Sequence, residues 1–340
     1  LKLFIYRIDR RNGMKKILVT QQLTGPGMDT LKERFQVTHP NGNRYTRDEI
    51  LNIIHEFDGI LAAGNRMDAE IIGAARNLKI ISVYGAGYDG IDVEEASRRN
   101  ILVANAPESV TEPTAELAFG LMLATARNIA AKDRWLRQNP GSKWGMMMRE
   151  GQSLYGKTLG IVGLGRIGKA VARRGLASGM KVFYFNRTRL GTDQEKDLGA
   201  DYLPLDQLLQ ESDVVSLHTP LTPQTHHLIG EDQLNRMKKS AFLINTARGE
   251  VVDEKALIRH LEQGNIAGAG LDVFEAEPHI PMGLLELDNV VLTPHIGTAT
   301  HEVRLEMTVE ACQNIIDFFD GKMPASTINP QVFSSFGTEG

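Results

Sequence analysis

Three segments in the second half of the sequence each end a strand-like run with a side chain suited to proton or anion chemistry. INTARGEVVDE (244–254), LDVFEAEP (271–278) and LTPHIGTA (292–299) carry Arg248, Glu277 and His295 in turn. In a doubly wound parallel sheet, the carboxyl ends of the strands face a common ligand crevice. The three side chains could therefore converge, although they lie far apart in the sequence.

This set of residues suits hydride transfer to a 2-oxo acid. A carbonyl that takes a hydride at carbon needs a proton at oxygen, and histidine titrates close enough to neutral pH to supply one. A neighbouring carboxylate fixes the tautomer of the histidine and favours its protonated form. An arginine can hold the substrate carboxylate and polarise the carbonyl. Spacing alone leaves open a surface ion pair between Glu277 and Arg248, and a buried, hydrogen-bonded His295.

A glycine-rich loop upstream indicates a dinucleotide. GIVGLGRIGKAVARR (160–174) follows a strand-like run and begins an amphipathic helix, with Gly163, Gly165 and Gly168 in the pattern G-x-G-x-x-G. The first glycine permits a tight turn, the second lets the backbone approach a pyrophosphate, and the third allows close helix–strand packing. The N–H groups of the first helical turn then face the anion. A plain strand-to-helix turn is the alternative, but the strand–loop–helix–strand context favours dinucleotide binding.

The next strand, VFYF, ends on Asn186-Arg187-Thr188-Arg189 instead of an acidic residue. An acid there would bind the ribose hydroxyls of NAD and repel a 2′-phosphate. Asn186 removes the negative charge, and the three residues after it could bind the phosphate. A basic surface loop would look the same. We predict that NADP(H) is preferred and that NAD(H) remains possible.

Two series of alternating strands and helices would position these residues. The first runs from Met14 to about Ala106, with strands at 15–20, 58–63 and 79–85 and helices at 28–35 and 68–75. The second begins at 158, with strands at 158–165, 181–185, 213–218, 241–246, 267–274 and 290–295, and helices at 231–237 and 254–264. A final helix is expected at about 301–320. Buried strands that alternate with amphipathic helices predict parallel sheets.

A single long helix is predicted between the two series, over 113–138. Pro113 suits its first turn, and Asn139-Pro140-Gly141 ends it. Apolar residues run nearly all round its first half, which predicts deep burial. The irregular stretch that follows, 142–156, contains Trp144 and Met146–Met148 and is typical of a linker or an interface loop.

Length and composition exclude several classes of function. A chain of 340 residues favours two domains. The net charge of −4, with no sustained basic run, gives no support to a nucleic-acid or membrane-surface role. The longest apolar stretch, 117–126, is too short to span a bilayer. Cys312 is the single cysteine and no secretory signal is visible, so we expect no disulfide, no cysteine-based metal site and a reducing, cytoplasmic setting.

The first 13 residues are left out of the fold prediction. Met14-Lys15-Lys16 before ILVT looks like a natural start followed by a buried strand. The preceding segment could derive from a vector, from an over-extended gene start, or from a genuine extra strand.

The chain resembles the D-isomer-specific 2-hydroxyacid dehydrogenase family from about Met14 to Pro330. The motifs that carry the resemblance are YGAGYDGID (84–92), NAPESVTEPTAELAFGLML (105–123), GIVGLGRIG (160–168), HTPLTPQTHHLI (218–229), NTARGEVVDE (245–254), GLDVFEAEP (270–278) and TPHIGTAT (293–300). The resemblance implies that Arg248, Glu277 and His295 are the catalytic arginine, glutamate and acid–base histidine. It also implies that Ala86-Gly87 offers N–H groups to the substrate carboxylate and that Thr298 adds a hydroxyl near the substrate.

The same resemblance implies a set of cofactor contacts. Arg166 and Ile167 would lie at the pyrophosphate, and Thr219-Pro220 along the adenosine side. Near the nicotinamide we expect Thr246-Ala247 and Asp272, and the resemblance adds Thr114, Thr225 and Gly297 to the cofactor-binding residues. Family members are usually dimers that pack through the long helix and the loop after it. Trp144 and Met146–Met148 would then lie at a homodimer interface instead of forming an exposed apolar patch.

The remaining histidines receive separate predictions. His218 ends a strand and is expected to pack or to contact the adenosine side. His226 and His227 are adjacent, but neighbours on a strand point apart and no acidic partners cluster nearby, so no metal site is predicted. Surface or interface positions are predicted for His39, His55, His260, His279 and His301.

We therefore predict an α/β protein of two doubly wound parallel-sheet domains with a cleft between them. A flavodoxin-like substrate-binding domain would comprise 14–110 and 300–330, and a Rossmann NAD(P)-binding domain 111–299. The expected reaction reduces a small 2-oxo acid, such as glyoxylate or hydroxypyruvate, to the D-2-hydroxy acid, with His295 as proton donor. The alternatives on this fold are a 2-ketogluconate reductase, a phosphoglycerate or phosphite dehydrogenase, and a corepressor-like protein that senses the dinucleotide.

Overall fold

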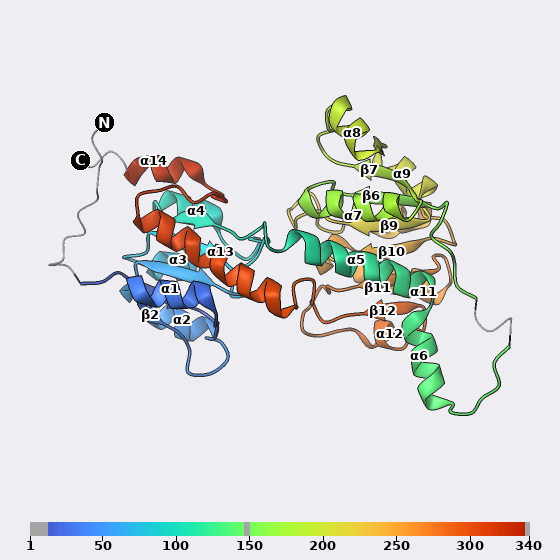
Figure 1. Cartoon of the computed structure of the whole chain (residues 1–340), viewed down its shortest axis with the longest axis horizontal. Helices are drawn as coiled ribbons and strands as arrows, with labels where there is room; N and C mark the ends of the chain where they lie inside the picture. Colours follow the sequence, from blue (N-terminus) through green and yellow to red (C-terminus); the bar gives the residue numbers. More distant parts are fainter. Residues whose placement is uncertain (1–12, 146–149, 337–340) are drawn as a thin grey trace. The chain divides into compact units, whose positions relative to one another are not determined.

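The computed structural model describes residues 13–145 and 150–336, and its chain divides into two compact units (Figure 1). Unit 1 takes the chain up to Val110 and again from Thr298 onward, and unit 2 is Thr111–Gly297. Two predictions fall outside the described residues. They concern the origin of the N-terminal segment, of which 1–12 are not described, and the place of Met146–Met148 at a homodimer interface. None of the helices in the described ranges is long and apolar enough to cross a membrane.

Unit 1 contains a five-stranded parallel sheet in the order β2-β1-β3-β4-β5. Its strands are β1 Lys16–Val19, β2 Gln36–Thr38, β3 Gly59–Ala62, β4 Ile80–Val83 and β5 Leu102–Ala104. This is the flavodoxin-like order of a doubly wound sheet, as predicted. The strands β3, β4 and β5 are buried along their whole length, because helices cover both faces.

Two groups of helices cover the sheet of unit 1. Side chains of α1 Pro26–Arg34 and α13 His301–Phe319 form one core with alternate residues of the strands. Those of α2 Arg47–Ile53, α3 Ala69–Ala74 and α4 Val93–Arg98 form the core on the opposite face. Figure 1 shows α13 lying along α1, although the two are far apart in sequence. Gly27 permits this approach, since a Cβ there would lie 2.6 Å from the carbonyl oxygen of Thr308.

Unit 2 contains a seven-stranded parallel sheet in the order β12-β11-β10-β9-β6-β7-β8. Its strands are β6 Thr158–Val162, β7 Lys181–Phe185, β8 Ala200–Tyr202, β9 Val214–Leu217, β10 Phe242–Asn245, β11 Gly268–Leu271 and β12 Val290–Leu292. The strand order reverses between β6 and β9. This is the Rossmann arrangement, in which ligands bind outside the carboxyl ends of the strands at the reversal. The predicted fold class is confirmed for both units.

Helices also cover both faces of the sheet in unit 2. α5 Thr111–Ala126 and α7 Arg166–Ala177 pack on one face. On the other face lie α9 Leu205–Glu211, α10 Glu231–Arg236, α11 Glu254–Glu262 and the short α12 Met282–Leu285. α8 Thr192–Leu198 follows β7 and packs beside β8.

The prediction of one helix over 113–138 is wrong. The structure ends α5 at Ala126 and begins a second helix, α6 Ile129–Gln138, after Asn128 in the left-handed conformation (φ 53°). The backbone N–H of Gln152 donates to the carbonyl of Ala126 at 2.7 Å, so a returning segment binds the end of α5. Asparagine adopts this conformation more readily than most residues. The apolar pattern gave no sign of the break, because it depends on a contact with a distant segment.

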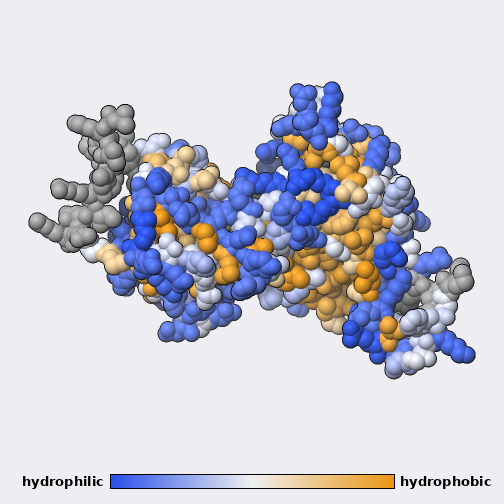
Figure 2. Space-filling view, viewed as in Figure 1, coloured by the Kyte–Doolittle hydropathy of each residue, from blue (hydrophilic) through white to orange (hydrophobic). Residues whose placement is uncertain are grey.

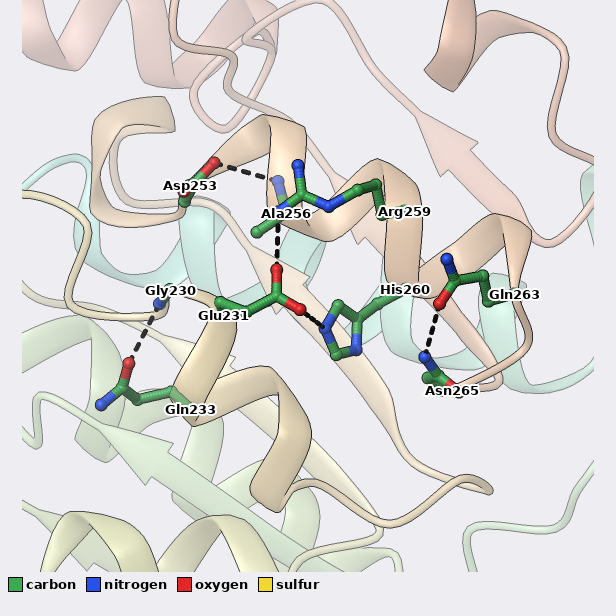
Figure 3. Close-up of polar contacts among 9 residues, drawn as sticks. All are labelled: Gly230, Glu231, Gln233, Asp253, Ala256, Arg259, His260, Gln263 and Asn265. Carbon is green, nitrogen blue, oxygen red and sulfur yellow. Dashed lines mark hydrogen bonds and ion pairs between the residues drawn. The ribbon is translucent and has the colours of Figure 1, made fainter.

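The prediction that His260 lies at the surface or at an interface is also wrong, since its side chain is only 2% exposed. Glu231, the first residue of α10, lies 3.0 Å from Nε2 of His260 and 2.6 Å from Arg259, both on α11 (Figure 3). Arg259 and His260 hold the pKa of the Glu231 carboxyl below its usual value. This contact joins α10 to α11 and is structural. His39, His55, His279 and His301 are exposed.

Candidate active site

The glycine loop lies at the point where the strand order of unit 2 reverses. Gly163 follows β6 with a φ of 98°, and a Cβ there would lie 2.7 Å from the backbone of His218, just after β9. A Cβ on Gly168 would overlap the carbonyl oxygen of Gly163. These two glycines are required by the fold itself, because no side chain fits at either position.

Gly165 differs from the other two glycines. A Cβ at this position would meet no described atom within 4 Å, and the backbone φ of −80° is open to any residue. Gly165 is the N-cap of the 12-residue α7, and no side chain of the described chain caps that end. The amides that begin at Arg166 and Ile167 are therefore the kind of site that binds an anion. The loop fits the pyrophosphate of a dinucleotide.

The end of β7 is fixed to this loop. Leu164 donates its N–H to Oδ1 of Asn186 at 2.6 Å, and Gly163 donates to the carbonyl of Phe185. Asn186 stands where an acidic residue would bind the ribose of NAD, and here its side chain holds the glycine loop. Arg187 and Thr188 follow it and are exposed.

Arg189 makes a contact that the sequence did not suggest. Its Nε and Nη2 both lie 2.8 Å from the carboxylate of Glu195 on α8, and its guanidinium stacks over Tyr202 at 5.4 Å. Tyr184 donates its hydroxyl to the same carboxylate at 2.7 Å. Arg189 and Tyr184 together lower the pKa of Glu195 to about 2. The sequence carried no signal for this pair, because α8 is polar along nearly its whole length.

Several buried polar atoms at the carboxyl ends of β9 and β10 suit a polar ligand. The hydroxyls of Thr219 and Thr246 and Nδ1 of His218 are buried without a hydrogen-bond partner in the described part of the chain. Buried polar atoms in proteins are nearly always hydrogen-bonded. Burial lowers the pKa of His218 to about 4, so this ring is neutral at physiological pH. Nε2 of His218 lies 2.8 Å from the hydroxyl of Ser216.

Thr225, also predicted to bind cofactor, stabilises a turn in this structure. Its hydroxyl donates to the carbonyl of Pro220 at 2.6 Å and accepts from the N–H of Thr222 at 2.8 Å. The segment that begins with Thr219-Pro220 is thereby held in a compact loop after β9.

The turn after β10 carries Arg248. Asn245 sets its shape, since Oδ1 accepts from the N–H of Ala247 at 3.0 Å and Nδ2 donates to the carbonyl of Arg248 at 2.9 Å. The next residue, Gly249, packs directly on the segment after β11, because a Cβ there would overlap the backbone of Phe274. This close packing brings the segment of Arg248 against the segment of Glu277.

Asp272 holds the loop that carries His295. The buried carboxylate of Asp272 accepts from the hydroxyl of Thr293 at 2.6 Å and from the N–H groups of Ile296 and Gly297 at 2.8 and 2.9 Å. Burial nevertheless raises its pKa. His295 adopts a φ of 51° and donates its own N–H to the carbonyl of Asp272. Gly297 lies close to Thr114 at the start of α5, since a Cβ on Gly297 would be 3.4 Å from the side chain of Thr114.

Glu277 and His295 form a direct pair. Nδ1 of His295 lies 2.8 Å from Oε2 of Glu277, and Oε1 accepts from the N–H of Phe274 at 3.0 Å. Burial by itself would raise the pKa of Glu277, but the bond to His295 and the charge of Arg248 bring it below its usual value. The carboxylate is therefore ionised, and half of the His295 side chain is exposed to solvent.

All three residues predicted to be catalytic belong to unit 2, whereas Ala86, Gly87 and Thr298 belong to unit 1. Ala86 and Gly87 follow the carboxyl end of β4, where the carbonyl of Ala86 accepts from Nδ2 of Asn105 at 2.7 Å. Tyr84 and Ala86 pack against Val110 and the start of α13.

The prediction that the side chains of His226 and His227 point apart is wrong. Their rings do not point apart but stack with centroids 4.0 Å apart, because His227 has a φ of 50° in a turn. An acidic partner is also present, since Nε2 of His227 lies 2.8 Å from Oε1 of Glu275. Among the described residues, no group of three or more histidine, cysteine or acidic side chains is arranged to hold a metal ion.

The chain is similar in sequence and in fold to known proteins. The family model described as "D-isomer specific 2-hydroxyacid dehydrogenase, NAD binding domain" matches residues 119–297. The chain is 45% identical over 321 residues to a glyoxylate reductase of Korarchaeum cryptofilum (strain OPF8), which covers 93% of this chain and 96% of that protein.

Two solved structures are similar over nearly the whole chain. A glyoxylate reductase from Paecilomyes thermophila has a TM-score of 0.86 and 33% identity, covering 94% of this chain and 100% of that one. An NADPH-dependent glyoxylate/hydroxypyruvate reductase from Sinorhizobium meliloti, in complex with NADP and malonate, has a TM-score of 0.83 and 34% identity. That match covers 93% of this chain and 97% of the other.

Proposed function

The chain belongs to the D-isomer-specific 2-hydroxyacid dehydrogenase family, and we propose that it reduces glyoxylate, hydroxypyruvate or a similar small 2-oxo acid to the D-2-hydroxy acid. It is an NAD(P)-dependent oxidoreductase. The observation that carries the proposal is the hydrogen-bonded pair of Glu277 and His295. The pair follows the carboxyl ends of β11 and β12, in the same parallel sheet whose strand β6 leads into the glycine loop. The relatives named glyoxylate reductase support the choice of substrate.

His295 acts as the proton donor in this proposal. A bound nicotinamide cofactor supplies the hydride to the 2-oxo carbon. Nδ1–H of His295 is held by the ionised Glu277, which leaves Nε2 to give its proton to the carbonyl oxygen. The negative charge of Glu277 favours the imidazolium that this step needs.

Arg248 binds the substrate carboxylate and polarises the carbonyl. A guanidinium can hold both carboxylate oxygens through two parallel N–H groups, which fixes the orientation of the 2-oxo group. The N–H groups of Ala86 and Gly87 and the hydroxyl of Thr298 would complete the substrate contacts. Unit 1 is then the substrate-binding domain and unit 2 the nucleotide-binding domain.

The cofactor contacts follow from unit 2. The pyrophosphate would lie on Gly165, Arg166 and Ile167, where the amides of α7 begin. The hydroxyls of Thr219 and Thr246 would find their missing partners in the cofactor. Ala247, Asp272 and Gly297 would lie towards the nicotinamide, together with Thr114.

We propose NADP(H) as the preferred cofactor. Arg187 and Thr188 are exposed after β7 and would bind the 2′-phosphate, while no acid stands there to repel it. Arg189 would support this loop from behind, since two of its nitrogens are bound to Glu195. The similar Sinorhizobium meliloti enzyme is named as NADPH-dependent.

We also propose a homodimer. Large apolar side chains are exposed on α5 and α6 and on the loop after them, namely Leu123, Ile129, Leu136 and Trp144, the last of which is 75% exposed. Figure 2 shows hydrophobic surface on the face of unit 2 that α5 crosses. An apolar area of this kind is typical of an interface. Sedimentation of the purified protein tests this part, and a monomer at micromolar concentration would contradict it.

The test of the function is a panel of 2-oxo acids assayed with NADPH and with NADH. We expect the highest kcat/KM for glyoxylate or hydroxypyruvate with NADPH, and a product of the D configuration on chiral analysis. Arg248→Ala should abolish turnover while cofactor binding persists. Failure to reduce any 2-oxo acid would contradict the function, and a higher kcat/KM with NADH on every substrate would contradict the cofactor preference.

A further inference from the structure

His227 connects the two segments that carry Arg248 and Glu277. Its backbone N–H donates to the carbonyl of Glu250 at 2.8 Å, two residues after Arg248. Its ring nitrogen Nε2 lies 2.8 Å from the carboxylate of Glu275, two residues before Glu277. One residue of the loop after β9 thus binds both segments at once.

Glu275 is the centre of this contact. Besides His227, its Oε1 accepts the backbone N–H of Glu254 at 3.1 Å, the first residue of α11. The backbone N–H of Glu275 in turn faces the carboxylate of Glu254 at 3.4 Å. The two carboxyl groups are near one another, and the pKa of Glu254 is raised, first by burial and then by the charge of Glu275. The N–H at Nε2 of His227 donates to Glu275 and so stabilises the negative charge of this pair of carboxyl groups.

The packing leaves little freedom between the same two segments. Gly249 lies against the backbone of Phe274 and Glu275 with no room for a Cβ. This contact sets how close the segments come, but glycine has no side chain that could form a hydrogen bond between them. Directional contacts between the segments come from the N–H of Asp272 to the carbonyl of Asn245 at 2.9 Å and from the bonds of Glu254 and His227 to Glu275, to which His227 contributes its side chain.

We propose that His227 is a positioning residue for the reductase reaction, which holds Glu277, and through it His295, in register with Arg248. The proposal rests on the roles of Arg248, Glu277 and His295 in the proposed function. His227 reaches the catalytic pair only through Glu275 and the backbone from Glu275 to Glu277. Its loss is therefore expected to change the geometry of the pair and not its chemistry.

The chain offers a matched control in His226. This residue stacks on His227, and its backbone N–H donates to the carbonyl of Thr222. His226→Ala removes an imidazole of the same size from the same turn without touching the bond to Glu275. His227→Ala removes the bond, and His227→Gln restores a donor close to where Nε2 was.

Steady-state kinetics of the full-length protein with glyoxylate and NADPH test the proposal. We expect His227→Ala to lower kcat by about ten- to hundredfold, because small displacements of catalytic groups have effects of that size. The KM for NADPH should stay close to that of the unchanged protein. His227→Gln should recover most of the lost kcat, and His226→Ala should have the kcat of the unchanged protein. Equal kcat values in His227→Ala and His226→Ala would overturn the proposal.

Hydrogen–deuterium exchange provides a readout that does not need turnover. His227→Ala should speed exchange in the peptides that cover 246–251 and 272–279, and His226→Ala should not. If His227→Ala does not fold, the kcat of His227→Gln decides, because this variant should keep most of the kcat of the unchanged protein. A kcat in His227→Gln as low as that of Arg248→Ala then contradicts the role. If Arg248→Ala keeps normal turnover, the proposed function is wrong, while the exchange experiment still tests the contact.

Discussion

Nδ1 of His295 lies 2.8 Å from Oε2 of Glu277, and each residue is held in place by a backbone contact of its own. Phe274 donates its N–H to Glu277, and the carbonyl of Asp272 accepts the N–H of His295. Asp272 and Phe274 belong to one segment after β11, so this segment orients both members of the pair. The contact depends on the pairing of β11 with β12, which sets the two segments side by side.

Replacing His295 should remove the proton donor and leave cofactor binding unchanged. General acid catalysis contributes about 10²- to 10⁴-fold to a rate, so we expect His295→Ala to lower kcat by that amount. Fluorescence titration with NADPH provides the control for folding, because the glycine loop follows β6 and should still bind the cofactor when His295, after β12, is replaced. Near-normal turnover in His295→Ala would show that another group gives the proton.

Two glycines of the same loop should respond differently to alanine. Gly165→Ala should leave the melting temperature of the free protein unchanged, because the Cβ meets nothing, and should weaken NADPH binding by at least about tenfold. Gly168→Ala forces a Cβ into the carbonyl of Gly163, and overpacking of this kind costs about 1–3 kcal/mol or more. Calorimetry and NADPH titration separate the two effects. Equal losses of stability would show that Gly165 is also a packing residue.

Arg187→Ala should reduce the preference for NADPH. A hydrogen bond to a charged group contributes about 1.5–3 kcal/mol, so kcat/KM with NADPH should fall about ten- to hundredfold while the value with NADH changes little. Arg189→Ala provides the comparison. Because Arg189 is bound to Glu195, its loss should lower the melting temperature as well. If Arg187→Ala prefers NADPH over NADH as strongly as the unchanged protein does, the 2′-phosphate is bound by other residues.

The Arg189–Glu195 pair gives a prediction for acid stability. The pKa of Glu195 is lowered to about 2, so the pair stabilises the fold above the ordinary glutamate pKa of about 4.3 and loses this effect as pH falls towards 2. Glu195→Gln should therefore be less stable than the unchanged protein at neutral pH. The difference between their melting temperatures should shrink as pH falls from about 4 to about 2. A difference that does not vary with pH would mean that the carboxylate charge contributes nothing.

Cys312 should be unreactive in the folded protein. Its thiol is buried between α13 and α1, with Sγ 3.8 Å from Sδ of Met28, and burial raises its pKa to about 12. Thiolate is the reactive species, so a disulfide reagent should modify Cys312 only after unit 1 unfolds. Fast labelling at neutral pH under native conditions would show that α13 leaves unit 1 transiently.

Local patterns were sufficient to predict the two sheets and most of their strands. Runs such as KILV and FLIN are apolar throughout because helices cover both faces of a parallel sheet, and this pattern needs no knowledge of distant residues. The three-residue strands β2, β5 and β8 were missed, whereas β12, equally short, was predicted because it lies within the longer run 290–295 that ends at His295. The break at Asn128 was missed for a different reason: apolar residues continue through it, and the N–H of Gln152 that binds the carbonyl of Ala126 comes from a distant segment.

Residue types and local spacing were enough to predict which groups could do the chemistry, namely the glycine loop, the strand-end residues Arg248, Glu277 and His295, and a basic segment in place of an acid. These follow from residue type and from spacing within single segments. The tertiary structure decided which of them are bound to one another. It placed Glu277 on His295, committed Arg189 to Glu195 and joined His227 to Glu275. Such pairs depend on strand order and on close backbone packing, and neither is encoded in the local periodicity of the chain.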